Sequence, residues 1–212
     1  MTNKNINRIV VGPVSTNCWI YQVGANEAAV IDQGDEAQTI ISALKKLSLT
    51  PKYILLTHGH FDHICALPEL KAAYEECQIA IHRLDSEYLG ADAYKVHSIS
   101  IKAATGDPSF IDSFWQDMPE PDLLFEEGVA VGPLTVLHVP GHTHGSSAFW
   151  DKKAGVIFTG DTLFRNGYGR TDLPGGDAEK MPASLRRLFE MDGNIAVYPG
   201  HGGETTIGRE AG

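Results

Sequence analysis

The 212-residue sequence contains no apolar run that reaches the roughly 18 residues of a membrane-spanning helix. Residues 1–8 are polar and lack the apolar stretch of a secretory signal. Cysteine is scarce, and Cys18, Cys65 and Cys77 are too widely spaced to form a CxxC pair and too few for a disulfide framework. These absences predict a cytoplasmic protein that makes no membrane contact and needs no disulfide.

Positive charge is also in short supply. The sequence has 17 Lys and Arg against 27 Asp and Glu, a formal net charge of −10, whereas nucleic acids bind a basic face. We therefore expect no nucleic-acid partner. No Gly-x-Ser-x-Gly segment is present, which disfavours a serine nucleophile. No low-complexity tract or Pro/Gly/Ser-rich linker divides the chain, so residues 1–212 are predicted to form a single domain.

The hydrophobic pattern predicts an α/β protein in which strands and helices alternate. Strands are expected over 8–11, 19–23, 28–32, 52–57, 79–81, 134–139, 147–150, 155–159 and 195–198, and helices over 36–47, 67–74 and 181–189. Asp35 is the expected N-cap of the first helix. Both halves share this rhythm, which predicts a four-layer αββα sandwich of two mixed sheets with helices outside.

The segment 86–127 is harder to interpret, because it is rich in turn formers and aromatic residues and has no clear period. A long irregular stretch of this kind is often a lid or a binding loop. A peripheral helix with loops that covers one sheet face is an equally good interpretation.

What the sequence does have is nine histidines. Three of them, with an aspartate, form the cluster His58-Gly59-His60-Phe61-Asp62-His63 directly after the strand 52–57. Imidazoles and carboxylates suit zinc, iron or manganese. His58 and His60 project to the same side of an extended chain, whereas Asp62 and His63 lie where a helix begins. The side chains of Asp62 and His63 can point toward the same region as those of His58 and His60, but at a different depth. This arrangement suits two adjacent metals better than one crowded metal.

Three further candidates share one topological feature. His142, Asp161 and His201 each follow a predicted strand and a glycine, which lets the backbone turn sharply at the end of the strand. Sites in α/β folds gather at the carboxyl ends of strands, so we expect these side chains to converge on one edge of the sandwich.

Together these residues resemble the metallo-β-lactamase-fold hydrolase superfamily, and most of all its short hydroxyacylglutathione hydrolase (glyoxalase II) branch. The pattern H-x-H-x-D-H, followed by a histidine, an aspartate and a histidine, is complete here. The segments 16–18, 30–34, 141–146 and 169–177 add supporting matches, so the resemblance spans almost the whole chain. These motifs are specific for the fold and the metal site and much less specific for the substrate.

The resemblance implies two divalent metal ions, zinc in the first place, with iron or manganese as alternatives. It places His58, His60 and His142 on one metal, Asp62, His63 and His201 on the second, and Asp161 between both. Asp62 and Asp161 are then the catalytic carboxylates. Asp32 is expected either to orient a ligand histidine or to serve as a turn residue before the helix.

The implied reaction is the hydrolysis of a thioester such as S-lactoylglutathione, a step of methylglyoxal detoxification, by a metal-bridging hydroxide. Two divalent cations add about +4, and two carboxylates with the hydroxide about −3, which leaves a site near +1 for an anionic substrate. Arg165, Arg170 and Arg209 lie near motif segments and are candidates for further positive charge. Longer relatives carry a C-terminal helical domain that holds glutathione. The chain stops at Gly212, soon after His201, so we expect no such domain, and glutathione specificity stays open.

Two alternatives remain. A persulfide dioxygenase of the same fold uses a single iron, which His58, His142 and Asp161 would hold here. A non-catalytic metal-binding module is the other, but it requires a closed site. His144, a candidate for the pocket rim, and Cys65, an expected packing residue, are the other residues to place.

Overall fold

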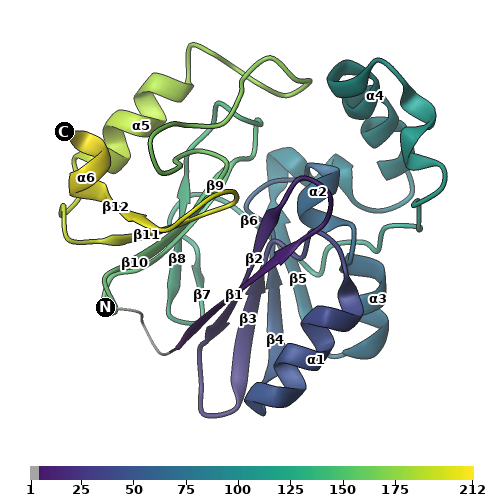
Figure 1. Ribbon diagram of the computed structural model, residues 1–212, viewed down its shortest axis with the longest axis horizontal. Coiled ribbons are helices and arrows are strands. Elements are labelled where there is room, and N and C mark those ends of the chain that lie inside the picture. Colours follow the sequence, from purple (N-terminus) through teal and green to yellow (C-terminus); the bar gives the residue numbers. More distant parts are fainter. Residues whose placement is uncertain (1–4) are drawn as a thin grey trace.

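The computed structural model describes residues 5–212, and Figure 1 shows two sheets packed face to face with helices on both outer sides. The first sheet has the order β1-β2-β3-β4-β5-β6 and the second the order β12-β11-β10-β9-β8-β7. The strands of the first sheet are β1 (Ile6–Val11), β2 (Thr16–Gln22), β3 (Glu27–Ile31), β4 (Thr50–Leu55), β5 (Gln78–His82) and β6 (Leu123–Phe125). Those of the second are β7 (Ala130–Val131), β8 (Leu134–His138), β9 (Ser147–Asp151), β10 (Val156–Gly160), β11 (Ala196–Pro199) and β12 (Thr205–Thr206). The sequence predicted a polar N-terminal segment over residues 1–8, of which residues 1–4 lie outside the described part of the chain.

Both sheets are mixed, as the sequence predicts. Strands β3 to β6 run parallel to one another, and β1 and β2 add antiparallel pairs. Among the described strands of the second sheet, β10 and β11 pair in parallel and the other neighbours pair antiparallel. Parallel neighbours end at the same edge, so the residues that follow β4, β10 and β11 are brought to one end of the sandwich.

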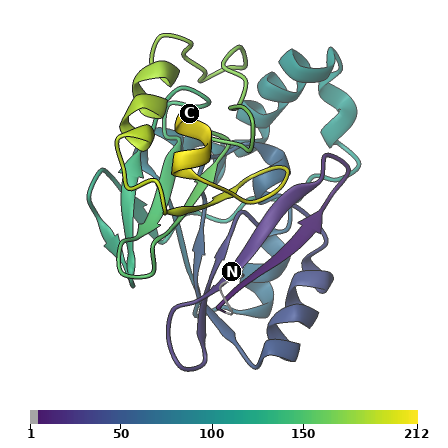
Figure 2. The same ribbon diagram turned by 60° about the vertical axis from the view of Figure 1, so that its left-hand side comes forward.

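The helices complete the four layers. They are α1 (Ala37–Leu47), α2 (Phe61–Ile64), α3 (Leu67–Ala73), α4 (Ala93–Thr105), α5 (Met181–Phe189) and α6 (Ile207–Ala211), with two 3-10 helices, η1 (Arg83–Tyr88) and η2 (Pro108–Ile111). Helices α1 and α3 pack on the outer face of the first sheet, and α5 and α6 on that of the second (Figure 2). The predicted αββα sandwich is confirmed. Within residues 5–212, no helix combines the length and the apolar character that crossing a bilayer requires.

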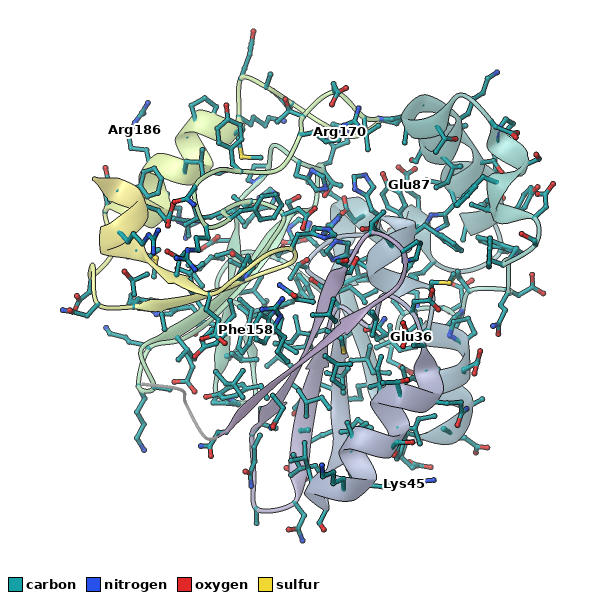
Figure 3. All side chains as sticks on the ribbon, in the orientation of Figure 1. Glu36, Lys45, Glu87, Phe158, Arg170 and Arg186 are labelled. Atoms are coloured by element: carbon teal, nitrogen blue, oxygen red, sulfur yellow. The ribbon has the colours of Figure 1, made fainter. Side chains whose placement is uncertain are left out.

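A buried core joins the two sheets. Trp19 of β2, Phe158 of β10 and Tyr198 of β11 pack together, with ring centroids 5.0 Å apart for Trp19 and Tyr198 and 5.3 Å for Phe158 and Tyr198. The Trp19 indole N–H donates a 3.0 Å hydrogen bond to the Pro199 carbonyl, so its one polar atom is satisfied inside the core. Figure 3 shows Phe158 near the centre of the molecule.

Helix α1 shows where the local prediction was wrong. Ile40, Ile41 and Leu44 are buried on its inner face as its period predicts. The N-cap is Glu36 rather than Asp35, and Glu36 has a left-handed backbone with φ 54°. The Asp35 side chain instead accepts a hydrogen bond from the Glu36 N–H at 2.6 Å, one position too early to cap the helix.

The segment 86–127 contains the end of η1, then α4, η2 and β6, so the peripheral helix that the sequence allowed is present. Figures 1 and 2 both show α4 at one end of the molecule, beside the turn between β1 and β2. The helix was hard to predict because Ala93, His97 and Ser100 are its buried residues, and two of these are polar. An apolar period of 3.6 residues is therefore missing from the sequence.

Candidate metal centre

All seven predicted ligand residues meet at one end of the sandwich, where the strands end and the connecting loops begin. His58 and His60 follow β4, and Asp62 and His63 belong to α2. The other three follow the second sheet's strands: His142 comes after β8, Asp161 after β10 and His201 after β11. The convergence of strand ends from two sheets, which the sequence predicted from glycines and spacing, is what the structure shows.

Six of the seven side chains fall into two neighbouring groups, and the ligand atoms within each group all lie within 4.8 Å of one another. The seventh, Asp161, groups in the same way with His58 and His63. His58, His60 and His142 make one group, and Asp62, His63 and His201 make the other. In the first, His60 Nδ1 lies 2.9 Å from His142 Nε2. In the second, the Nε2 atoms of His63 and His201 are 3.2 Å apart.

Asp161 lies between the two groups. Its Oδ1 is 3.4 Å from His63 Nε2, and its Oδ2 is 3.6 Å from His142 Nε2 and 3.5 Å from His201 Nε2. One carboxylate thus faces ligands of both groups, the position that a bridging residue requires.

The donor set fits divalent cations. Nitrogen ligands roughly 2.0–2.1 Å from a tetrahedral ion lie about 3.3–3.4 Å apart. The 3.2 Å between His63 and His201 is close to this spacing, and the 2.9 Å between His60 and His142 is shorter. His58 Nε2 and Asp161 Oδ1 are buried atoms that make no hydrogen bond within residues 5–212. Buried polar atoms normally have partners, so these two indicate a ligand at this point.

Glycine at position 200 is what allows this close assembly. A Cβ added to Gly200 would overlap Asp161 Oδ1 and approach His63 Cε1 to 2.7 Å. The Pro-Gly-His segment therefore needs glycine because a carboxylate and an imidazole of the cluster occupy the space of a side chain.

The charges of the two groups differ. Burial holds the pKa values of His58 and His60 well below the usual histidine range, with neighbouring imidazoles adding to the effect, so both rings are neutral and can offer lone pairs. Burial also opposes a charge on His63, but the carboxylates of Asp161, Asp62 and Asp32 raise the pKa of His63 to about 10. A cation in the second group would take the place of protons on its histidines.

Asp32 contacts His63 of the second ligand group directly, and it contacts His58 of the first group through the hydroxyl of Thr57. Its Oδ2 lies 3.2 Å from His63 Nδ1 and accepts a 2.7 Å hydrogen bond from Thr57 Oγ1. The same Thr57 Oγ1 lies 3.0 Å from His58 Nδ1. Partners on the Nδ1 side direct the Nε2 atoms of His58 and His63 toward the cluster. These contacts place Asp32 where it can orient ligand-set histidines, the first of its two expected roles, and that role stays a prediction.

Arg170 contributes through its backbone. Its carbonyl accepts a 2.7 Å hydrogen bond from His142 Nδ1, which leaves His142 Nε2 for the cluster. The guanidinium, in contrast, donates two 2.7 Å hydrogen bonds to Asp172. Its charge is therefore paired, and the pKa of Asp172 falls to about 2 through this contact. Figure 3 shows Arg170 at the same end of the molecule as Glu87.

Sequence reasoning missed Asp85, which joins the loops of the first group. This buried carboxylate accepts hydrogen bonds from Gly59 N at 3.2 Å, Thr143 Oγ1 at 2.7 Å and Gly145 N at 2.6 Å. Burial raises the pKa of Asp85, and the three donors act in the opposite direction. The available signal was its place just beyond the strand 79–81, at the edge where the ligands gather.

A cavity of about 530 Å³ opens onto both groups, with His60, Asp62, His142, Asp161 and His201 in its lining. Its other walls come from the turn after β1, from α4 and η2, and from the loop after β10. A substrate can therefore reach the cluster, which a closed structural metal site would prevent.

The remaining candidates lie outside the cluster. His144 is exposed, and its backbone carbonyl accepts a 2.8 Å hydrogen bond from His138 Nε2. Among the described residues that line the cavity, His144, Arg165 and Arg209 are absent. Cys65 does line it, and burial raises the pKa of this thiol to about 12, which disfavours the nucleophilic thiolate form.

Comparison with known proteins agrees with this geometry. Residues 11–201, which include all seven cluster residues, match the family described as the metallo-beta-lactamase superfamily. Hydroxyacylglutathione hydrolase GloC of Haemophilus influenzae is 36% identical over 210 residues, which cover 97% of this chain and 94% of that protein.

Two solved structures superpose closely. The crystal structure of TTHA1623 in a di-iron-bound form gives a TM-score of 0.80 at 35% identity, covering 97% of this chain and 96% of that one. The BLEG-1 B3 metallo-beta-lactamase gives a TM-score of 0.81 at 32% identity, covering 97% and 95%. Relatives of nearly the same length thus carry names of different activities, so the substrate has to be argued from this chain's own residues.

Proposed function

The chain belongs to the metallo-beta-lactamase superfamily, and we propose that it is a two-metal hydrolase of thioesters, similar in reaction to hydroxyacylglutathione hydrolase. The observation that carries the proposal is the position of Asp161 between two groups of ligand-type side chains on the wall of an open cavity. We propose His58, His60 and His142 for one metal ion and Asp62, His63 and His201 for the other. Zinc, iron and manganese all suit this donor set.

Cations bound there would lower the pKa of a water molecule and polarise a carbonyl oxygen. The acyl group is transferred to water: a C–O bond forms, the C–S bond breaks, and the thiol leaves with a proton that comes from the attacking water. Asp62 lines the cavity and its side chain is 36% exposed, so it can accept a hydrogen bond from that water. Thr16 Oγ1, 3.3 Å from Asp62 Oδ2, orients the carboxylate.

The single-iron alternative is decided by assay and metal content. A persulfide dioxygenase would use His58, His142 and Asp161, which a two-metal hydrolase also uses, so the ligand residues alone do not separate the two activities. The open cavity argues against a non-catalytic metal module. The name of the Haemophilus relative supports a thioester, because hydroxyacylglutathione is one.

The experiment is a direct comparison of two substrates. Metal-loaded protein is assayed for cleavage of S-lactoylglutathione and, in parallel, for oxygen uptake with glutathione persulfide. We expect thioester cleavage that a chelator abolishes and added divalent metal restores. Oxygen uptake with one bound iron and no thioester cleavage would overturn the proposal.

The matched variants are Asp161→Ala and Glu76→Ala, the second at an exposed carboxylate just before β5. We expect Asp161→Ala to lose metal and nearly all activity while remaining soluble, and Glu76→Ala to behave as the wild type. Full turnover by Asp161→Ala would exclude the bridging role.

A further inference from the structure

The cavity wall formed by α4, η2 and their neighbours is apolar. Beyond the metal cluster, the lining contains Pro13, Val14, Phe61, Ile101, Ala104, Phe110, Phe114, Phe164 and Leu173. These residues come from four separate stretches of the chain, which converge at this end of the molecule (Figures 1 and 2).

Several of these apolar side chains are not packed away. Val14 and Phe114 are each 55% exposed and Phe110 is 50% exposed. The rings of Phe110 and Phe114 have centroids 5.9 Å apart, so they form one continuous aromatic surface at the cavity. Large apolar side chains left exposed around a cavity mark a surface that a ligand covers.

The same lining offers little to a charged substrate. Apart from the cluster, the charged residues among the described lining are Asp35 and Arg170. The Arg170 guanidinium is engaged with Asp172 through two hydrogen bonds. Glutathione carries two carboxylates, and recognition of carboxylates normally uses a free guanidinium or ammonium group. In this lining, the Arg170 guanidinium would have to leave Asp172 before it could bind a carboxylate of glutathione.

We propose that the preferred substrates are thioesters with an apolar acyl group, aromatic or medium-chain, rather than small hydroxyacyl derivatives of glutathione. The acyl chain packs against Ile101, Phe110 and Phe114 while its carbonyl lies at the cluster. This inference rests on the proposed function and specifies its substrate class.

The test uses thioesters that share one uncharged thiol, N-acetylcysteamine. S-Phenylacetyl and S-hexanoyl derivatives are compared with the S-lactoyl derivative, and S-lactoylglutathione is assayed alongside. We expect kcat/KM for the phenylacetyl thioester to exceed that for the lactoyl thioester by about tenfold or more, because an apolar pocket gains from each methylene it buries.

Two isoleucines on α4 provide matched variants. Ile101 lines the cavity, whereas Ile99 is 52% exposed and is not part of the described lining. The ratio of kcat/KM for the phenylacetyl thioester to kcat/KM for the lactoyl thioester should fall about tenfold in Ile101→Ser. The same ratio should not change in Ile99→Ser. Phe110→Ser, at a half-exposed site, repeats the test without disturbing a buried residue.

The outcomes separate the two claims. A preference for S-lactoylglutathione, with the same substrate ratio in Ile101→Ser as in Ile99→Ser, overturns this inference and leaves the thioester hydrolase intact. No cleavage of any thioester by metal-loaded protein overturns the proposed function, and this inference with it.

Discussion

Asp85 Oδ2 accepts a 2.7 Å hydrogen bond from Thr143 Oγ1, which ties the loop of His142 to the 3-10 helix η1. The same carboxylate accepts hydrogen bonds from the backbone of Gly59 and Gly145. Asp85 thereby fixes the relative position of two loops that come from different sheets. The first metal-ligand group depends on this position, although Asp85 belongs to neither group.

Replacement of Asp85 should therefore weaken both the fold and the metal site. Asp85→Ala leaves three buried donors without an acceptor, and we expect a loss of roughly 3 kcal/mol or more in the free energy of unfolding. Urea denaturation measures this loss. Glu87→Ala, at an exposed acid of the same η1, is the control and should change stability by less than about 0.5 kcal/mol. Equal stabilities of the two variants would show that Asp85 does not join the loops.

Asp32→Asn tests the orientation of the ligand histidines. Asn accepts the left-handed backbone that Asp32 has, with φ 56°, so the fold should be retained. The contact to His63 Nδ1 is weakened, and we expect metal affinity to fall about 10–100-fold. Competition with a chelator measures the affinity, and Glu76→Gln, at an exposed carboxylate before β5, is the control. An unchanged affinity would leave Asp32 as a turn residue only.

Gly200→Ala tests the close packing around Asp161. The added Cβ would collide with Asp161 Oδ1, so the carboxylate must move and activity should fall about 100-fold. Gly167→Ala is the control, because a Cβ there meets no atom within 4 Å. Turnover and bound metal are measured for both variants. Wild-type turnover in Gly200→Ala would contradict the geometry of the cluster.

His97 predicts a dependence of stability on pH. Burial lowers the pKa of His97 from 6.5 to about 4, while its Nε2 donates to the Tyr88 carbonyl at 2.9 Å. Between these pH values the unfolded chain binds a proton that the folded chain does not. The contribution of His97 to the free energy of unfolding is thus fully present above pH 6.5. It is lost as the pH falls toward 4, by up to about 1.4 kcal/mol per pH unit.

His97→Gln keeps a donor for the Tyr88 carbonyl but cannot titrate. The variant should lose less stability than the wild type when urea denaturation is repeated at about pH 7 and about pH 5. His82, whose pKa burial also lowers to about 4, contributes equally to both proteins and cancels. Identical pH dependence in the two proteins would mean that His97 is not held neutral.

The sequence predicted the cluster better than its surroundings. His58, His142 and His201 each follow a strand, and strands that end at one edge bring such residues together whatever the details of packing. Asp85 was missed because its partners, Gly59 and Gly145, are close only in the folded chain. The segment 86–127 was offered as a lid or a binding loop, but its helix was not placed, because α4 buries polar residues and shows no helical period. That residues 1–212 form a single domain stays a prediction.

The number of metal ions needed for activity tests the central claim most directly. Protein stripped by a chelator is titrated with zinc or manganese, and thioester hydrolysis is measured at each ratio of metal to chain. Because Asp161 lies between two complete ligand groups, we expect activity to rise until two ions are bound per chain. Full activity without metal, or a plateau at one ion per chain, would contradict the account.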